Sequence, residues 1–140
     1  AFEVLRGLAL RYDSSRYPYG WACGKKRMTK FPYLLENNFW EFPPSTFSFG
    51  RMQIPFAGGT FLRYSPLRLI KENISKINLE GQPAMVYFHS WEFDCGKRPG
   101  VMPEWKRLIQ YGNMGSVQGK LKELLKNFPF SSIRNILGIC

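Results

Sequence analysis

One histidine closes an apolar run of this sequence, and a tryptophan and two carboxylates follow it directly. Residues 84–88 are apolar, aromatic or β-branched, which predicts a short buried strand. His89 is the only histidine of the chain, and Trp91, Glu92 and Asp94 come next. Imidazole exchanges a proton near neutral pH. Because catalytic groups collect where the strands of α/β folds end, the pattern favours acid–base chemistry. A histidine that only ties down a loop is the alternative.

Further polar side chains stand at predicted strand ends or turns. Asp13 follows a predicted strand at residues 10–12, and Arg63 follows a double glycine. Asp13 and Glu92 are candidate partners that orient or charge the histidine. For Asp13 the alternative is a turn-forming residue before two serines. Arg63 is a candidate ligand of a carboxylate or sugar hydroxyl, or else forms a structural ion pair with Glu41. Trp91 is a candidate sugar-stacking wall, or else packs in the core.

The spacing of hydrophobic residues, and the glycines and prolines that interrupt it, predict the helices and strands that must position these groups. Consecutive prolines at 43 and 44 exclude a central strand in residues 39–49, which predicts an edge or broken strand there. The double glycine predicts a tight turn or a close backbone approach within residues 55–63. The other predicted elements are the tail of a helix at 1–9, a long loop at 16–38, a helix from Ser65-Pro66 to Gly81, a loop at 95–103, a helix that begins at Gly115 or Ser116, and a terminal strand or helix at 130–139.

Composition narrows the classes of partner and compartment. The chain has 140 residues and a formal net charge of +10, which favours an anionic partner. The basic residues are scattered, with one tight run at 25–27, and no nucleic-acid-binding motif is present. Cys23, Cys95 and Cys140 lack any metal-binding spacing and are expected to be free thiols, which favours a reducing compartment such as the cytoplasm. No apolar stretch is long enough to span a bilayer.

Four segments, taken in order, resemble a known family. They are Tyr12-Asp13-Ser14-Ser15, then Glu41 with Pro43, Ser45 and Thr46, then Pro55 with Gly58, Gly59 and Arg63, then Tyr87-Phe88-His89 with Trp91, Glu92 and Asp94. In this order they resemble the C-terminal half of bacterial polysaccharide deacetylases of the NodB-homology type, in the subgroup found with exopolysaccharide and PEP-CTERM/exosortase loci. The sequence departs from the family at Thr60, Ser90 and Cys95, where a glycine and two prolines are usual.

The resemblance implies a fold and a division of the chain. The implied fold is α/β, the C-terminal part of a distorted (β/α) barrel of polysaccharide deacetylase type, plus a C-terminal helical extension. Residues 1–94, including the long loop 16–38, would belong to the barrel. Residues 95–140 would be the family-specific extension.

The resemblance also implies a reaction, namely metal-assisted hydrolysis of N-acetyl groups on a polysaccharide. His89 matches the acid that protonates the leaving amine. Asp13 is the second candidate catalytic residue, and Arg63, Trp91 and Glu92 are the candidate substrate-binding residues. No residue of this chain is expected to bind a metal, because the family's Asp-Asp motif and its paired histidines belong to an N-terminal half that this sequence does not contain. A divalent metal such as zinc is expected in the complete parent, and the chain alone is expected to be inactive.

A different class of function competes with this one. The alternative is a non-catalytic basic module that binds acidic glycan or nucleic acid, which fits the charge and the aromatic content. Salt-dependent binding to generic DNA would favour that alternative.

Overall fold

The computed structural model describes residues 2–8, 10–18, 20–21, 29–35, 38–50, 52–94, 96 and 102–138. It divides into two compact units, residues 1–89 and residues 90–140. The three cysteines, the basic run 25–27 and most of the predicted loop 95–103 lie outside the described residues.

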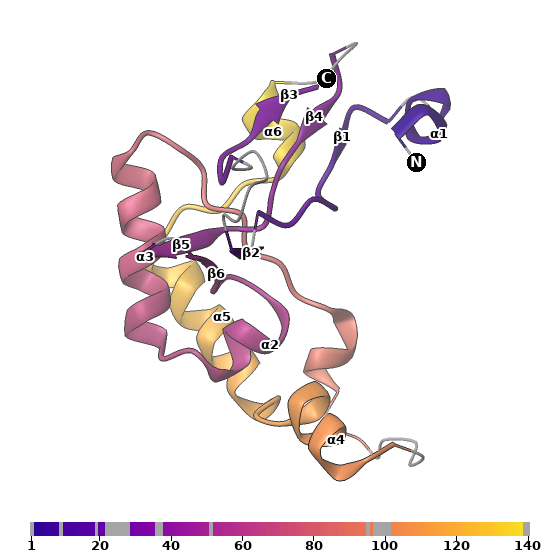
Figure 1. Cartoon of the computed structure of the whole chain (residues 1–140). Helices are drawn as coiled ribbons and strands as arrows, with labels where there is room; N and C mark the ends of the chain where they lie inside the picture. Colours follow the sequence, from indigo (N-terminus) through magenta and orange to yellow (C-terminus); the bar gives the residue numbers. More distant parts are fainter. Residues whose placement is uncertain are drawn as a thin grey trace. The chain divides into compact units, whose positions relative to one another are not determined.

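The first unit contains a three-stranded sheet that carries Asp13. Helix α1 (Phe2–Gly7) precedes β1 (Tyr12–Asp13), as predicted from the sequence. Strand β4 (Trp40–Glu41) is central, parallel to β1 and antiparallel to β3 (Tyr33–Leu34) (Figure 1). The amides of Trp40 and Phe42 donate to the carbonyls of Arg11 and Asp13, at 2.9 and 2.8 Å. This ladder fixes Asp13 at a strand end.

A second three-stranded sheet lies in the same unit. Strand β6 (Met52–Pro55) pairs antiparallel with both β5 (Thr46–Phe49) and β2 (Gly20–Trp21). Strands β2 and β3 fall inside residues 16–38, so the prediction of an uninterrupted loop there was wrong. Residues 39–49 do form a broken strand, as predicted. Pro43 and Pro44 separate β4 from β5, since proline has no amide to donate to a ladder.

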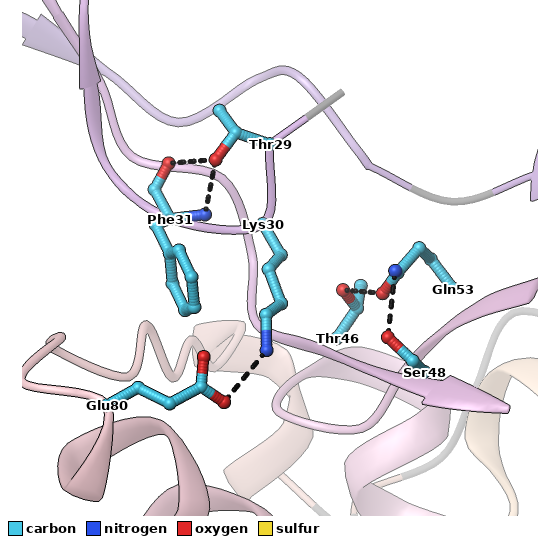
Figure 2. A network of polar contacts seen from close by, with 7 residues as sticks. All are labelled: Thr29, Lys30, Phe31, Thr46, Ser48, Gln53 and Glu80. Atoms are coloured by element: carbon cyan, nitrogen blue, oxygen red, sulfur yellow. Dashed lines mark hydrogen bonds and ion pairs between the residues drawn. The ribbon is translucent and has the colours of Figure 1, made fainter. Parts of the chain in front are cut away.

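Side-chain hydrogen bonds reinforce the hairpin and the end of the longest helix of this unit (Figure 2). Thr46 Oγ1 donates to Gln53 Oε1, and Gln53 Nε2 donates to Ser48 Oγ, each at 3.0 Å. Lys30 Nζ lies 3.1 Å from Glu80 Oε1. The second contact ties the segment before β3 to the residue that follows α3 (Leu67–Leu79).

Two helices supply the apolar core of the first unit. Helix α2 (Gly59–Tyr64) begins at the second glycine of the pair, with Gly58 as its N-cap, and α3 buries the predicted stripe of isoleucines. The structure corrects the start of α3: Pro66 is its N-cap, and Ser65 instead ends α2 through its amide, which donates to the Phe61 carbonyl at 2.8 Å. The buried apolar side chains of this unit include Phe39, Phe42, Phe56, Ala57, Leu62, Ile70, Ile74 and Ile77.

The apolar run before His89 is not the regular buried strand that the sequence predicts. Residues 82–88 are half-buried and extended, with one isolated bridge, between Gly58 and Tyr87. The neighbouring segments explain this, because one is the proline-broken stretch before β5 and the other is the turn into α2. Those segments offer the run too few amides and carbonyls in a row for a ladder.

The second unit is helical. The 3₁₀ turn η2 (Ser90–Phe93) opens it, and α5 (Gly115–Asn127) buries Val117 and Leu124. The undecided terminal element is the helix α6 (Ile133–Leu137), whose Ser132 N-cap accepts the Asn135 amide at 3.2 Å. The sequence analysis did not anticipate α4 (Glu104–Tyr111).

The described residues therefore form a mixed α/β fold, as predicted, with two small sheets and six α-helices. None of the helices that the structure describes is long and apolar enough to cross a membrane. The predicted domain boundary between residues 94 and 95 rests on the family resemblance, and it stays a prediction.

Candidate functional site

The best-defined polar cluster of the first unit surrounds the turn after β1. Asp13 on β1, Glu41 on β4 and Tyr33 on β3 are neighbours in register across the sheet. Paired residues of adjacent strands project from the same face, so two carboxyl groups and a phenol share one row. The Arg16 Nη1 donates to the Tyr33 hydroxyl at 3.4 Å. The row is thus flanked by one cation from the turn.

Three hydrogen bonds fix the turn itself. Ser14 Oγ donates to the Phe42 carbonyl at 2.6 Å, and Ser15 Oγ donates to Asp13 Oδ2 at 2.5 Å. The Arg16 amide donates to Glu41 Oε1 at 2.9 Å. The turn-forming and the catalytic interpretations of Asp13 are therefore compatible, because the same turn presents its half-buried carboxylate.

Glu41 is wholly buried, and its two oxygens differ. Oε1 accepts the Arg16 amide, whereas Oε2 has no hydrogen-bond partner among the described residues. Burial raises the pKa of the Glu41 carboxyl above its ordinary value of 4.5. The charge of Asp13 also raises it, and the Arg16 amide and guanidinium and the Ser15 amide partly offset the rise. Desolvation dominates because a buried carboxylate loses its water.

The raised pKa of Glu41 predicts how stability depends on pH. The folded state keeps this proton over a range where the unfolded chain has lost it. Its contribution to stability is therefore complete below pH 4.5 and is lost as pH rises through the folded-state pKa. Gln at position 41 is neutral throughout. We expect the unfolding free energy of the wild type, minus that of Glu41→Gln, to fall across this window in urea titrations. A rise of this difference with pH would contradict the assignment.

Tyr87 connects the predicted catalytic histidine to the double glycine. Its ring meets the His89 ring edge-to-face with centroids 5.5 Å apart, and its hydroxyl is hydrogen-bonded to that of Tyr17. A Cβ on Gly58 would stand 2.1 Å from the Tyr87 ring. The predicted close backbone approach is confirmed, and its cause is an aromatic ring seated directly on Gly58. His89 itself is exposed.

Ser45 holds the extended segment that leads to His89. The Met85 amide donates to Ser45 Oγ at 2.7 Å, and the Ser45 amide donates to the Met85 carbonyl at 3.3 Å. Ser45→Ala removes the hydroxyl acceptor of the Met85 amide. We expect a loss of about 1–3 kcal/mol in unfolding free energy, measured by urea titration, with faster hydrogen exchange at Met85. The matched Ser48→Ala change, at an exposed hairpin position, should stay within about 0.5 kcal/mol. Equal effects of the two changes would refute the role of Ser45.

Arg63 lies in α2 and is buried, with 1% of its surface exposed. Its Nη2 donates to Thr60 Oγ1 at 3.0 Å. The alternative ion pair with Glu41 is wrong, because the described contacts give Glu41 the Arg16 amide on one oxygen and nothing on the other. A role of Arg63 in substrate binding stays a prediction.

Trp91 and Glu92 belong to η2 in the second unit. Glu92 is buried, and the half-buried Trp91 packs edge-to-face on Tyr111 with centroids 5.8 Å apart. Tyr111 also lines a hollow of about 410 Å³ along α4, together with Glu104, Arg107, Leu108 and Gly112. The Tyr111 contact accounts for part of the Trp91 surface, and both the sugar-stacking role and packing in the core stay predictions.

The predicted cluster of His89, Asp13, Arg63 and Trp91 remains a prediction. The described contacts join Asp13 to Ser15 and the β4 strand, and His89 to Tyr87. In the part of the chain that the structure describes, no three histidine, cysteine or acidic side chains gather in a way that could hold a metal ion.

The chain is thus a small mixed α/β protein with a buried carboxyl group beside an accessible one at a strand end. It belongs to the family described as Domain of unknown function (DUF3473), whose profile matches residues 14–138. That family is associated with C-terminal regions of polysaccharide deacetylases. No curated protein and no solved structure matches the chain significantly.

Sequence reasoning missed three contributors to this region. Tyr17 gave no signal inside an aperiodic stretch. Ser45 was recognised only as part of a motif, and its alternation with Pro43 could not reveal its bond to Met85. Glu41 was weighed only as an ion-pair partner. A glutamate between aromatic residues, in Phe39-Trp40-Glu41-Phe42, was a signal of burial.

Proposed function

We propose that this chain is the C-terminal part of a polysaccharide deacetylase-like hydrolase that removes N-acetyl groups from an exopolysaccharide in bacteria. The observation that carries the proposal is the family match over residues 14–138, together with the association of that family with deacetylase C-terminal regions. The ordered motifs around Asp13, Arg63 and His89 support the same conclusion. In this proposal the two small sheets are completed into a distorted barrel by a further polypeptide that carries the family's Asp-Asp and paired-histidine motifs.

The roles of this chain's residues follow from their chemistry. In amide hydrolysis, water adds to the carbonyl carbon, the C–N bond breaks, and the nitrogen must gain a proton to leave as an amine. His89 is exposed, so its ring is accessible to a substrate and can deliver that proton. Asp13 is its proposed catalytic partner and would orient the ring. Arg63, Trp91 and Glu92 would hold the sugar. We assign no metal-dependent step to this chain.

The test compares the 140-residue chain with the same chain supplied with the missing half. Acetate release from a partly N-acetylated polysaccharide is measured, and metal content is determined by elemental analysis. We expect the chain alone to release no acetate and to bind no divalent metal at the active site. The completed protein should release acetate and bind the metal. Acetate release by the purified chain alone would refute the assignment of roles.

The alternative, a basic module for acidic glycan or nucleic acid, is favoured by the net charge of +10. It predicts binding to generic DNA that weakens linearly on a log–log scale as salt rises. Such binding by the chain, with no acetate release after completion, would replace the deacetylase proposal with this one.

A further inference from the structure

Glu41 is a polar group of the first unit that is costly to bury. It sits in the central strand with no exposed surface, and Oε2 has no hydrogen-bond partner among the described residues. A buried, unpaired carboxylate oxygen is expensive, and a neutral carboxyl group is much cheaper to bury. A group left in this state needs an explanation.

The groups that face Glu41 come from every strand of its sheet and from the turn. Asp13 of β1 and Tyr33 of β3 are its in-register neighbours, and Arg16 contributes both its amide and its guanidinium. Asp13 is half-buried and has Ser15 as a donor, whereas Glu41 is wholly enclosed. When two neighbouring carboxyl groups compete for one proton, the group in the less polar surroundings takes it.

We propose that Glu41 is a positioning residue for Asp13: it anchors the Asp13–Arg16 turn through the Arg16 amide, and it takes the first proton of the carboxyl pair, so that Asp13 remains the charged member. The inference rests on the proposed function only for the use made of Asp13. The buried carboxyl group of Glu41 thus lies next to the more accessible one of Asp13 on the adjacent strand. This arrangement delivers a negative charge at the strand end without two adjacent charges in the sheet. The raised pKa of Glu41 supports the direction of proton uptake.

The Arg16 amide reports directly on the protonation of Glu41, because its N–H donates to Glu41 Oε1 with a nitrogen–oxygen distance of 2.9 Å. Its ¹H and ¹⁵N shifts are followed against pH in the isotope-labelled 140-residue chain. The Arg16 amide should titrate above pH 4.5, the ordinary value for a glutamate.

Three variants separate anchoring from proton uptake. Glu41→Gln keeps an acceptor for the Arg16 amide, so hydrogen-exchange protection should remain while the pH-dependent shift disappears. Glu41→Ala removes the acceptor, so both should be lost. Asp13→Asn removes the neighbouring charge, so the Arg16 titration should move to lower pH.

The inference is overturned if the Arg16 amide titrates at or below pH 4.5, if Asp13→Asn leaves its titration in place, or if Glu41→Gln loses protection as Glu41→Ala does. These measurements need no deacetylase activity. If they give the expected pattern while the completed protein releases no acetate, the proposed function fails and the role of Glu41 stands. If instead the completed protein releases acetate while the Arg16 measurements fail, only the proposed role of Glu41 is refuted.

Discussion

Gly58→Ala should destabilise the first unit by about 1–3 kcal/mol or more, as overpacking of a filled site does. The φ angle of Gly58 is −174°, an extended value that any residue adopts. The cost is therefore steric: an added Cβ would stand 2.1, 2.3 and 2.4 Å from three ring atoms of Tyr87. The Tyr87 side chain has little freedom to move away, because its hydroxyl is hydrogen-bonded to that of Tyr17. The Tyr87 backbone amide also donates to the Ala57 carbonyl at 3.0 Å.

Urea unfolding monitored by far-UV circular dichroism measures this effect. Gly7→Ala is the matched control in the same unit, since nothing lies within 4 Å of a Cβ placed there, and it should change stability little. Because the clash is with one ring, Gly58→Ala combined with Tyr87→Ala should cost less than the sum of the single changes. Additive effects, or a Gly58→Ala protein as stable as the wild type, would mean that the Tyr87 ring is not seated as described.

The elements predicted well are those whose signals are local. The isoleucine stripe of α3 and the buried Val117 and Leu124 of α5 follow helical spacing, which is a property of one segment alone. The break between β4 and β5 follows from two prolines that cannot donate. Helix α4 also had local signals that the analysis overlooked, since Pro103 precedes its first residue and Glu104 occupies its first turn.

The features that escaped prediction depend on partners remote in the sequence. Residues 84–88 have the composition of a strand, but strand formation needs a neighbouring ladder, and here the neighbours provide isolated hydrogen bonds at Ser45 and Ala57. The state of Glu41 depends on its pairing with Asp13 across 28 positions of sequence between β1 and β4. No pattern in either segment alone specifies that register, so the buried half of the carboxyl pair was visible only in the structure.

If the completed protein is the proposed deacetylase, replacing His89 with alanine should lower turnover about 10²–10⁴-fold, the usual contribution of a positioned general acid. The leaving amine then has no protein donor and must take its proton from water. Metal affinity should be nearly unchanged, because His89 matches the acid of the family and not a metal ligand. The fold should survive, since His89 is exposed and its described ring contact is with Tyr87, an edge-to-face pair worth about 0.5–1.5 kcal/mol.

Steady-state kinetics with elemental analysis for the metal and a urea titration separate these effects. The control is Gln110→Ala, an exposed change on α4, which should leave turnover within about twofold because it touches no proposed catalytic group. A proton donor that acts on the leaving group also predicts that added imidazole restores part of the lost rate. A histidine that only supported the loop would show no such rescue, and its loss would lower stability and metal content together with turnover. Unchanged turnover in His89→Ala, with metal retained, would show that another group donates the proton and that the resemblance around His89 has been assigned the wrong chemistry.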